Sequence, residues 1–177
     1  TLIVLAPLML SVALWIKIDS PGPVLFRQVR VGRGGGYFRI LKFRSMRMDT
    51  AARGPQLTVG HDPRITRAGA WIRRYKIDEF PQFINVLRGD MSIVGPRPHP
   101  VALDEQHRSL IPRYYFRHKI RPGITGLAQI IARNREDVTF SDSVLLDLYY
   151  ADNQSLWLDL KILFKTIPVM VFGKGGV

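Results

Sequence analysis

The chain has 177 residues, of which 46% are apolar, so it is long enough to bury a core and too apolar to be disordered through most of its length. It contains no cysteine, which excludes disulfide bonds, thiolate zinc sites and a cysteine nucleophile. The formal net charge of +12 favours a polyanionic partner, and nucleic acid, an anionic membrane surface and a phosphorylated substrate are the three candidates.

The first predicted element is an uncharged apolar helix from Thr1 to Ile16. A straight helix of that length reaches roughly 24 Å, which is short of the roughly 30 Å hydrocarbon core of a bilayer. The alternatives are a signal-peptide core, a truncated spanning helix, a re-entrant helix and a helix buried in a soluble core. No basic residue precedes the run and no small-residue cleavage site follows it, which disfavours a signal peptide.

Pro7 lies near the middle of this run, where it removes one helical hydrogen bond and bends the helix. A bent helix that enters the membrane and returns on the same side explains both the shortness of the run and its proline. We therefore expect residues 1–18 to form a re-entrant membrane helix. Because the chain begins inside the apolar run, we also expect it to be truncated at its N-terminus.

Two extended runs follow, Val24–Val31 and Tyr37–Arg44, and the triplet Gly34–Gly36 between them predicts a β-hairpin. Period-two alternation puts Lys42 and Arg44 on one face of the second strand, where they are either solvated or paired phosphate contacts. The glycine triplet is not a P-loop, because no Gly-Lys-Ser/Thr follows it.

A polar segment, 48–60, predicts a loop before a helix over residues 64–76. A second helix is predicted to begin at Asp78 or Glu79 and to stop at Gly89. The apolar residues of its expected buried face recur at helical spacing and are Phe80, Phe83, Ile84 and Leu87.

Asp78 and Glu79 thus stand at a predicted helix N-terminus, where the helix dipole favours negative charge and should keep both ionised. The simpler interpretation is that Asp78 is an N-cap and Glu79 a favourable first-turn acid. The alternative is that the two adjacent carboxylates bind Mg²⁺, which proteins hold by one or two carboxylates together with substrate phosphates.

Arginines near the acid pair favour the second interpretation. Arg73 precedes the pair by about one helical turn, and Arg97 stands between Pro96 and Pro98 on stiff backbone. A guanidinium fork matches phosphate geometry. An acid pair, a metal and an arginine clamp together form a phosphoryl-transfer site, in which a carboxylate can also act as the nucleophile.

The last predicted element is an amphipathic helix over residues 155–172 with Trp157 near its start. Lys161 and Lys165 lie four residues apart, away from an apolar stripe, as in helices that lie in a membrane interface. An ordinary amphipathic helix packed on a soluble core is the alternative. The elements together predict an α+β, mostly helical fold, and the four histidines show no metal-ligand spacing.

The chain resembles the bacterial sugar transferase family, the monotopic phosphoglycosyl transferases that start glycan assembly on polyprenyl phosphate. The segments that carry the resemblance span almost the whole chain in the family's order and are Asp19–Gln28, Lys42–Met46, Asp62–Thr66, Ile77–Gln82, Asn85–Pro98, Arg121–Gly126 and Ser155–Lys161. Ala6 and Pro7 match the Ala/Ser-Pro break of the family's re-entrant helix. The family usually reads Ser-Leu-Asp-Glu-Leu-Pro where this chain has Lys76-Ile-Asp-Glu-Phe-Pro.

The resemblance implies a reaction. A nucleoside diphosphate sugar, usually a uridine one, donates its phospho-sugar to polyprenyl phosphate, giving a polyprenyl-diphosphate sugar and a nucleoside monophosphate. Asp78 matches the family's nucleophile, which forms a covalent phospho-sugar aspartate, and Glu79 would help it to hold Mg²⁺. By position, Arg73 and Arg97 would bind phosphates, and Lys42, Arg44 and Arg121 are further candidates.

The resemblance also implies a location and a domain organisation. We expect a membrane helix over residues 1–18 and a catalytic domain over 19–177, at the bacterial inner membrane with the active site facing the cytoplasm. The basic surplus agrees with an anionic cytoplasmic leaflet and membrane lipids as partners. A nucleic-acid partner is not expected, because the arginines surround an acid pair rather than stacking aromatics. The sequence leaves the donor sugar and the oligomeric state open.

Overall fold

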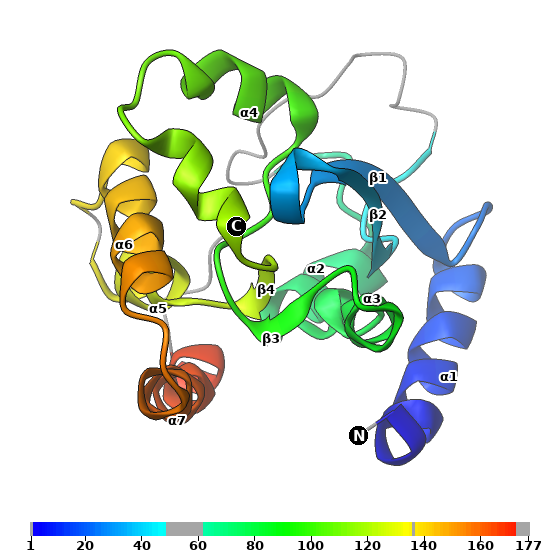
Figure 1. Ribbon diagram of the computed structural model, residues 1–177. Coiled ribbons are helices and arrows are strands. Elements are labelled where there is room, and N and C mark those ends of the chain that lie inside the picture. The colour runs from blue at the N-terminus through cyan, green and yellow to red at the C-terminus, as the bar shows by residue number, and fades with distance from the viewer. Residues whose placement is uncertain (1, 49–61, 136, 173–177) are drawn as a thin grey trace. The chain divides into compact units, whose positions relative to one another are not determined.

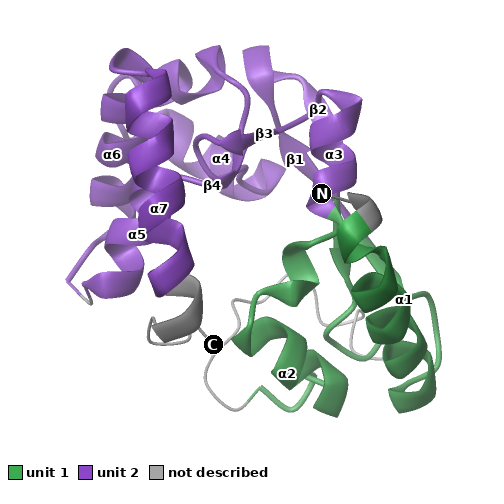
Figure 2. Cartoon of the chain, turned by 90° about the horizontal axis from the view of Figure 1, so that it is seen from below, with its two compact units in different colours: residues 1–26, 41–81, 175–177 green, residues 27–40, 82–174 purple. Residues whose placement is uncertain are grey.

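The computed structural model describes residues 2–48, 62–135 and 137–172 (Figure 1). Helices outweigh two small sheets, which confirms the predicted mixed α and β class. The chain divides into two compact units (Figure 2): unit 1 takes in residues 1–26 and 41–81, and unit 2 takes in residues 27–40 and 82–174. The loop predicted over 48–60 lies outside the described residues except for its first residue.

The predicted hairpin is confirmed. Strands β1 (Leu25–Val31) and β2 (Tyr37–Phe43) pair as a two-stranded sheet, and the short turn η1 (Arg33–Gly35) joins them. Gly34 and Gly35 have φ angles of 68° and 80°, a left-handed conformation that glycine adopts without steric cost. The boundary between the two units falls within both strands.

Unit 1 is built on helix α1 (Leu2–Asp19) and helix α2 (Arg67–Arg74). Its core contains Val12 and Ile16 from α1 and Ala68 and Ile72 from α2. The hydroxyl of Thr66 caps α2 by accepting a hydrogen bond from the Gly69 amide at 2.9 Å. This cap starts the helix later than the predicted residue 64.

Only one side of α1 enters this core. Val12 and Ile16 are buried, but large apolar residues on the rest of the helix are exposed by 63% or more of their surface: Val4, Leu10, Leu14 and Ile18. Pro7 stands inside the helix, and the Ser11 hydroxyl donates to its carbonyl oxygen at 3.0 Å. Among the described residues, no helix combines the length and the apolar character needed to cross a membrane.

The second segment of unit 2 begins with helix α3 (Gln82–Arg88), which starts later than the predicted Asp78 or Glu79. The predicted buried face is confirmed only in part: Phe80 packs against the core of unit 1, and Phe83 and Ile84 are half-buried. Gln82 and Asn85 are the buried residues of α3, whereas Leu87 is 76% exposed. The physical reason is that the Asn85 side-chain amide donates to the Arg39 carbonyl at 2.9 Å and to Asp90 at 3.1 Å, so the polar side faces inward.

The remaining elements of unit 2 are β3 (Ser92–Val94), α4 (Val101–Arg108), η4 (Tyr114–Lys119), β4 (Gly123–Thr125), α5 (Leu127–Asn134), α6 (Phe140–Asp152) and α7 (Leu156–Phe172). Strands β3 and β4 run parallel, with Ser92 opposite Gly123 and Val94 opposite Thr125. A side chain at Gly123 would collide with the backbone of Gly95, so glycine is required for this close approach.

Helix α5 packs against both α6 and α7 in unit 2 (Figure 1), and the three helices share a core of Ile130, Tyr150 and Ile162 with Val94 of β3. The predicted helix at the C-terminal end is confirmed as α7. Its apolar stripe enters the core only in part: Leu163 packs against that core, whereas Leu156, Phe164 and Ile167 are exposed by 77%, 72% and 63%.

Candidate active site

The acid pair lies in a short 3₁₀ turn, η3 (Ile77–Glu79), between α2 and α3. Lys76 precedes it in a left-handed conformation with φ 57°, which separates the turn from α2. The Glu79 amide then donates to the Lys76 carbonyl at 3.1 Å. The expectation that Asp78 caps a helix is therefore wrong, because the following α-helix begins only at Gln82.

Asp78 is buried, with 8% of its surface exposed, and its Oδ1 atom has no hydrogen-bond partner in the part of the chain that the structure describes. Burial and, to a lesser degree, the neighbouring Glu79 carboxylate raise the pKa of Asp78. Lys42, Lys76 and Arg73 oppose this shift. The expectation that a helix dipole holds the charge on Asp78 is thus corrected, because desolvation dominates.

Glu79 is held by an ion pair. The Lys42 ammonium lies 2.8 Å from Glu79 Oε1, and the two side chains are 17% and 12% exposed. The structure therefore brings Lys42, at the end of β2, together with the acid pair. Arg73 is half-buried in the last turn of α2, and its positive charge acts to lower the pKa of Asp78.

Arg44 lies elsewhere in unit 1, although the alternation of the strand predicted that it would project beside Lys42. Its guanidinium is buried and donates to the Ser20 carbonyl at 2.6 Å, the Ser20 hydroxyl at 2.9 Å and the Pro21 carbonyl at 2.6 Å. Strand β2 ends at Phe43, so the alternation stops before Arg44. These partners, at the C-terminal end of α1, favour a structural role over a phosphate contact.

Arg97 and Arg121 belong to unit 2. Arg97 is exposed between the buried residues Pro96 and Pro98, and its Nη1 atom donates to Gln129 Oε1 at 3.1 Å. Arg121 is exposed in the segment that leads into β4. The predicted site residues are therefore divided between the units, with Asp78, Glu79, Lys42 and Arg73 in unit 1.

The donor set of the acid pair suits Mg²⁺. No group of three histidine and acidic side chains that could hold a metal occurs among the described residues. Mg²⁺ does not need one, because it is usually held by one or two carboxylates together with water and substrate phosphates. Asp78 and Glu79 supply two adjacent carboxylates, and the unpartnered Oδ1 atom of Asp78 is the kind of oxygen such an ion would satisfy.

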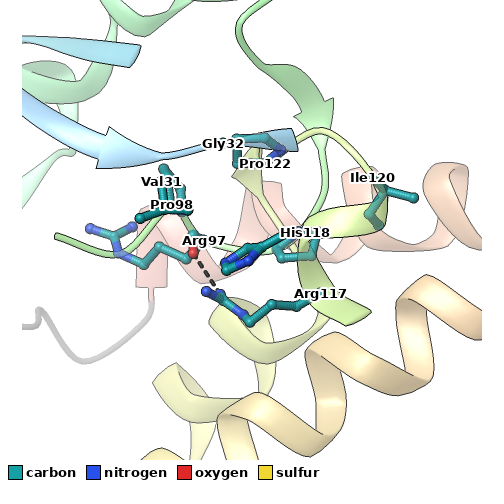
Figure 3. Close-up of a pocket in the computed structure, with 9 residues that line it drawn as sticks. Val31, Gly32, Arg97, Pro98, Arg117, His118, Ile120 and Pro122 are labelled. Carbon is teal, nitrogen blue, oxygen red and sulfur yellow. Dashed lines mark hydrogen bonds between the residues drawn. The ribbon is translucent and has the colours of Figure 1, made fainter. Parts of the chain in front are cut away.

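Sequence reasoning missed a buried polar cluster in unit 2. Arg117 is 3% exposed and contacts His99, Tyr114 and Asp147. Part of this cluster lines a small pocket with Arg97, Pro98 and His118 (Figure 3). No periodic signal marks Arg117 or Asp147, because one lies in a 3₁₀ turn and the other in a helix thirty residues later.

A family profile and individual relatives agree. The profile described as Bacterial sugar transferase matches residues 1–173. The chain is 48% identical over 174 residues to the UDP-N-acetylgalactosamine-undecaprenyl-phosphate N-acetylgalactosaminephosphotransferase of Aeromonas hydrophila, which covers 97% of this chain and 41% of that protein. It is 47% identical over 169 residues to the UDP-glucose:undecaprenyl-phosphate glucose-1-phosphate transferase of Escherichia coli (strain K12), covering 94% of this chain and 36% of that protein.

A shorter relative matches over most of both chains. The exopolysaccharide production protein PSS of Rhizobium leguminosarum bv. phaseoli is 47% identical over 182 residues, covering 98% of this chain and 91% of that protein. The present chain thus spans about two fifths or less of the first two relatives, and nine tenths of the third.

Proposed function

The chain belongs to the bacterial sugar transferase family, and from that membership we propose that it transfers a phospho-sugar from a nucleoside diphosphate sugar to polyprenyl phosphate. The names of its relatives support a UDP-sugar donor and undecaprenyl phosphate as the acceptor. The observation that carries the proposal is Asp78, a buried carboxylate with an unpartnered oxygen beside the Glu79–Lys42 ion pair.

In the proposed first step, an Asp78 carboxylate oxygen attacks the β-phosphorus of the donor. A bond forms between aspartate oxygen and phosphorus, and the bond from that phosphorus to the bridging oxygen breaks. The electron pair leaves with the nucleoside monophosphate. In the second step, an oxygen of polyprenyl phosphate attacks the same phosphorus, which releases the Asp78 carboxylate and forms the polyprenyl-diphosphate sugar.

Burial suits Asp78 to this role, because a poorly solvated carboxylate loses little hydration when it attacks. It must be ionised to react, and the nearby Lys42, Lys76 and Arg73 favour the ionised form. Lys42 also fixes the orientation of Glu79. Asp78 and Glu79 would hold Mg²⁺, which when bound neutralises charge on the phosphates and on the leaving nucleotide.

The arginines supply the phosphate contacts in this proposal. Arg73, Arg97 and Arg121 are the proposed phosphate ligands. Arg97 is suited to the task because its loop is stiffened by two prolines, so its guanidinium loses little entropy when a phosphate binds.

We assign residues 1–18 to a re-entrant membrane helix, 19–177 to the catalytic domain and 155–172 to an interfacial helix. The large apolar residues that α1 and α7 leave exposed support this assignment, since a membrane would cover them. Trp157, 67% exposed with Lys161 over its ring, suits the headgroup level. The proposed location is the bacterial inner membrane, with the site on its cytoplasmic side.

The test is an assay with purified protein, Mg²⁺, undecaprenyl phosphate and either UDP-glucose or UDP-N-acetylgalactosamine. Release of uridine monophosphate should depend on the lipid, and Asp78→Asn should lower the rate about 10⁴-fold or more, as for other lost nucleophiles. Asp137→Asn, which removes an exposed aspartate paired with Arg135, is the matched control and should retain the rate.

Mass spectrometry without the acceptor should detect a phospho-sugar adduct on Asp78. Full activity in Asp78→Asn would overturn the mechanism, and sugar phosphate released without lipid would identify a hydrolase instead. A lipid-dependent product without any adduct would indicate direct transfer.

A further inference from the structure

Arg117 carries a guanidinium in the interior of unit 2. It lies in η4, is 3% exposed, and its Nη2 atom lies 2.6 Å from Asp147 Oδ2 of α6. Burying an ion pair does not usually stabilise a fold more than apolar residues of the same volume would. Packing alone therefore does not account for the pair, and its other contacts indicate what it does.

Those contacts lead to the loop that carries Arg97. Arg117 Nη2 donates to the Arg97 carbonyl oxygen at 2.7 Å, and Nη1 lies 3.0 Å from Nδ1 of His99. The guanidinium thus binds the loop at two points, on either side of Pro98. Figure 3 shows the bond to the Arg97 carbonyl, with the Arg97 side chain extending away from Arg117.

The neighbours of Arg117 keep this arrangement in one state. His99 is buried and its pKa is lowered to about 2, first by burial and then by the charge of Arg117, so its ring is neutral and Nδ1 can accept a hydrogen bond. The Tyr114 hydroxyl lies 2.8 Å from the same atom, and the Tyr114 ring lies under the Arg117 guanidinium. The His99 carbonyl in turn accepts from the Val31 amide at 3.2 Å.

We infer that Arg117, held by Asp147, is a positioning residue that fixes the Pro96–His99 backbone and so places the Arg97 guanidinium for the phosphates of the donor. The inference rests on the proposed function, in which Arg97 binds phosphate. Arg117 itself is buried. Its effect passes through the Arg97 backbone. The Arg97 side chain is held separately by its hydrogen bond to Gln129 Oε1.

The test replaces the buried pair by apolar residues of similar size, Arg117→Met with Asp147→Leu, because such replacements often leave stability unchanged or higher. The donor KM should rise about tenfold to a hundredfold, as for a catalytic group displaced by about 1 Å. The KM for undecaprenyl phosphate and the midpoint of thermal unfolding should stay near those of the parent protein.

A matched control is present in the same two segments. Arg113, directly before η4, pairs with Asp152 of α6 at 3.0 Å, but this pair is about half exposed and has no contact with the Arg97 loop among the contacts described for it. Arg113→Met with Asp152→Leu therefore removes an η4–α6 ion pair without altering the loop. The donor KM of this variant should equal that of the parent protein.

A double-mutant cycle with Arg97→Ala separates positioning from general damage. If Arg117 acts through Arg97, the apolar pair should add no further rise in donor KM once Arg97 is alanine. If the rises in donor KM caused by Arg97→Ala and by Arg117→Met with Asp147→Leu multiply, the inference is overturned and the buried pair is merely structural. A donor KM equal to that of the parent protein in Arg117→Met with Asp147→Leu would overturn it as well.

Binding of UDP, measured by calorimetry without turnover, should weaken in the same variants and in the same non-additive way. An Arg97→Ala variant with parent-like donor KM and UDP affinity would instead refute the phosphate role of Arg97, and the positioning inference with it. If Arg97→Ala raises the donor KM and weakens UDP binding but Arg117→Met with Asp147→Leu changes neither, only the positioning inference is refuted.

Discussion

At the scale of single residues, the site is organised by burial. Asp78 is a carboxylate with an unpartnered oxygen inside unit 1, beside a second carboxylate. Such an arrangement destabilises the charged form, and it persists in proteins where a carboxylate must react. The predicted helix cap is replaced by a strained turn at Lys76 that places the acid pair on η3.

Asp78→Asn should stabilise the protein while abolishing transfer. Burial raises the pKa of Asp78 above its unfolded value, so the stability it contributes is present at acidic pH and is lost as pH rises through the folded-state pKa. At neutral pH the amide should raise the free energy of unfolding by about 0.5–2 kcal/mol, the usual scale of a single stabilising substitution. Thermal unfolding from neutral to acidic pH measures this.

The gain should shrink as the pH falls and Asp78 in the parent protein becomes protonated. Asp137→Asn is again the control, because Arg135 lowers the pKa of that exposed carboxyl and its replacement should bring no gain. A lower midpoint for Asp78→Asn at neutral pH would show that its carboxylate is stabilised by an interaction absent from this structure.

Lys42→Met should move the acid limb of the pH–rate profile to higher pH. The Lys42 charge lowers the pKa of Asp78 against the larger effect of burial, so its removal leaves Asp78 protonated over a wider range. It also releases Glu79, which the ammonium holds at 2.8 Å. We expect kcat/KM at neutral pH to fall about a hundredfold, within the usual range for loss of a proton-controlling group.

The pH dependence of kcat/KM measures the shift, and Lys42→Arg should restore most of the parent profile because it keeps the charge. An unmoved acid limb in Lys42→Met would mean that the limb reports a group other than Asp78. Arg44→Met gives a contrasting result: its partners are Ser20 and Pro21, so it should lower stability more than it moves the limb.

At the scale of elements, the apolar residues of α7 divide between the core of unit 2 and the surface. Ile162 enters the core of unit 2, whereas Leu156 and Phe164 remain exposed by 77% and 72%. An ordinary helix on a soluble core would bury its apolar stripe. The exposed residues are those that the proposed interfacial helix would insert into the membrane surface.

Leu156→Ser with Phe164→Ser should weaken binding to vesicles that contain phosphatidylglycerol by about tenfold or more. Burying a large apolar side chain in an apolar phase stabilises by about 1.5–3 kcal/mol. Because neither side chain packs in the core, the midpoint of thermal unfolding should change little, as for other surface substitutions. Vesicle co-sedimentation measures the binding.

The matched control is Leu145→Ser with Tyr149→Ser in α6, since these residues are exposed by 58% and 57%. Helix α6 carries three aspartates and no basic residue, so an anionic surface repels it. Equal losses of vesicle binding in the two variants would count against a specific interfacial role for α7.

At the scale of the whole molecule, the charge of +12 should make attachment to membranes sensitive to salt. Raising the ionic strength from about 0.1 M to about 1 M shortens the screening length from about 10 Å to about 3 Å. Binding to anionic vesicles should therefore fall, while the weaker binding to neutral vesicles, which depends on apolar residues, should not. If salt changes binding to anionic and to neutral vesicles equally, the net charge of the chain does not contribute to membrane attachment.

The sequence by itself determined the mixed α and β class, the hairpin, helices α1, α2 and α7, and the identity of the acid pair. These features follow from local periodicity, from glycine in left-handed turns and from continuous motifs, all of which act over a few residues. The conformation of the acid pair was misjudged, because the apolar spacing after it resembled a helix that in fact begins only at Gln82.

Only the tertiary structure decided what each side chain contacts. It buried Asp78 and raised its pKa, turned the polar side of α3 inward, and sent Arg44 to the end of α1 instead of beside Lys42. It also joined Arg117 to Asp147 and to the Arg97 backbone. Burial and long-range pairing depend on segments far apart in the chain, so periodicity along the sequence does not predict them.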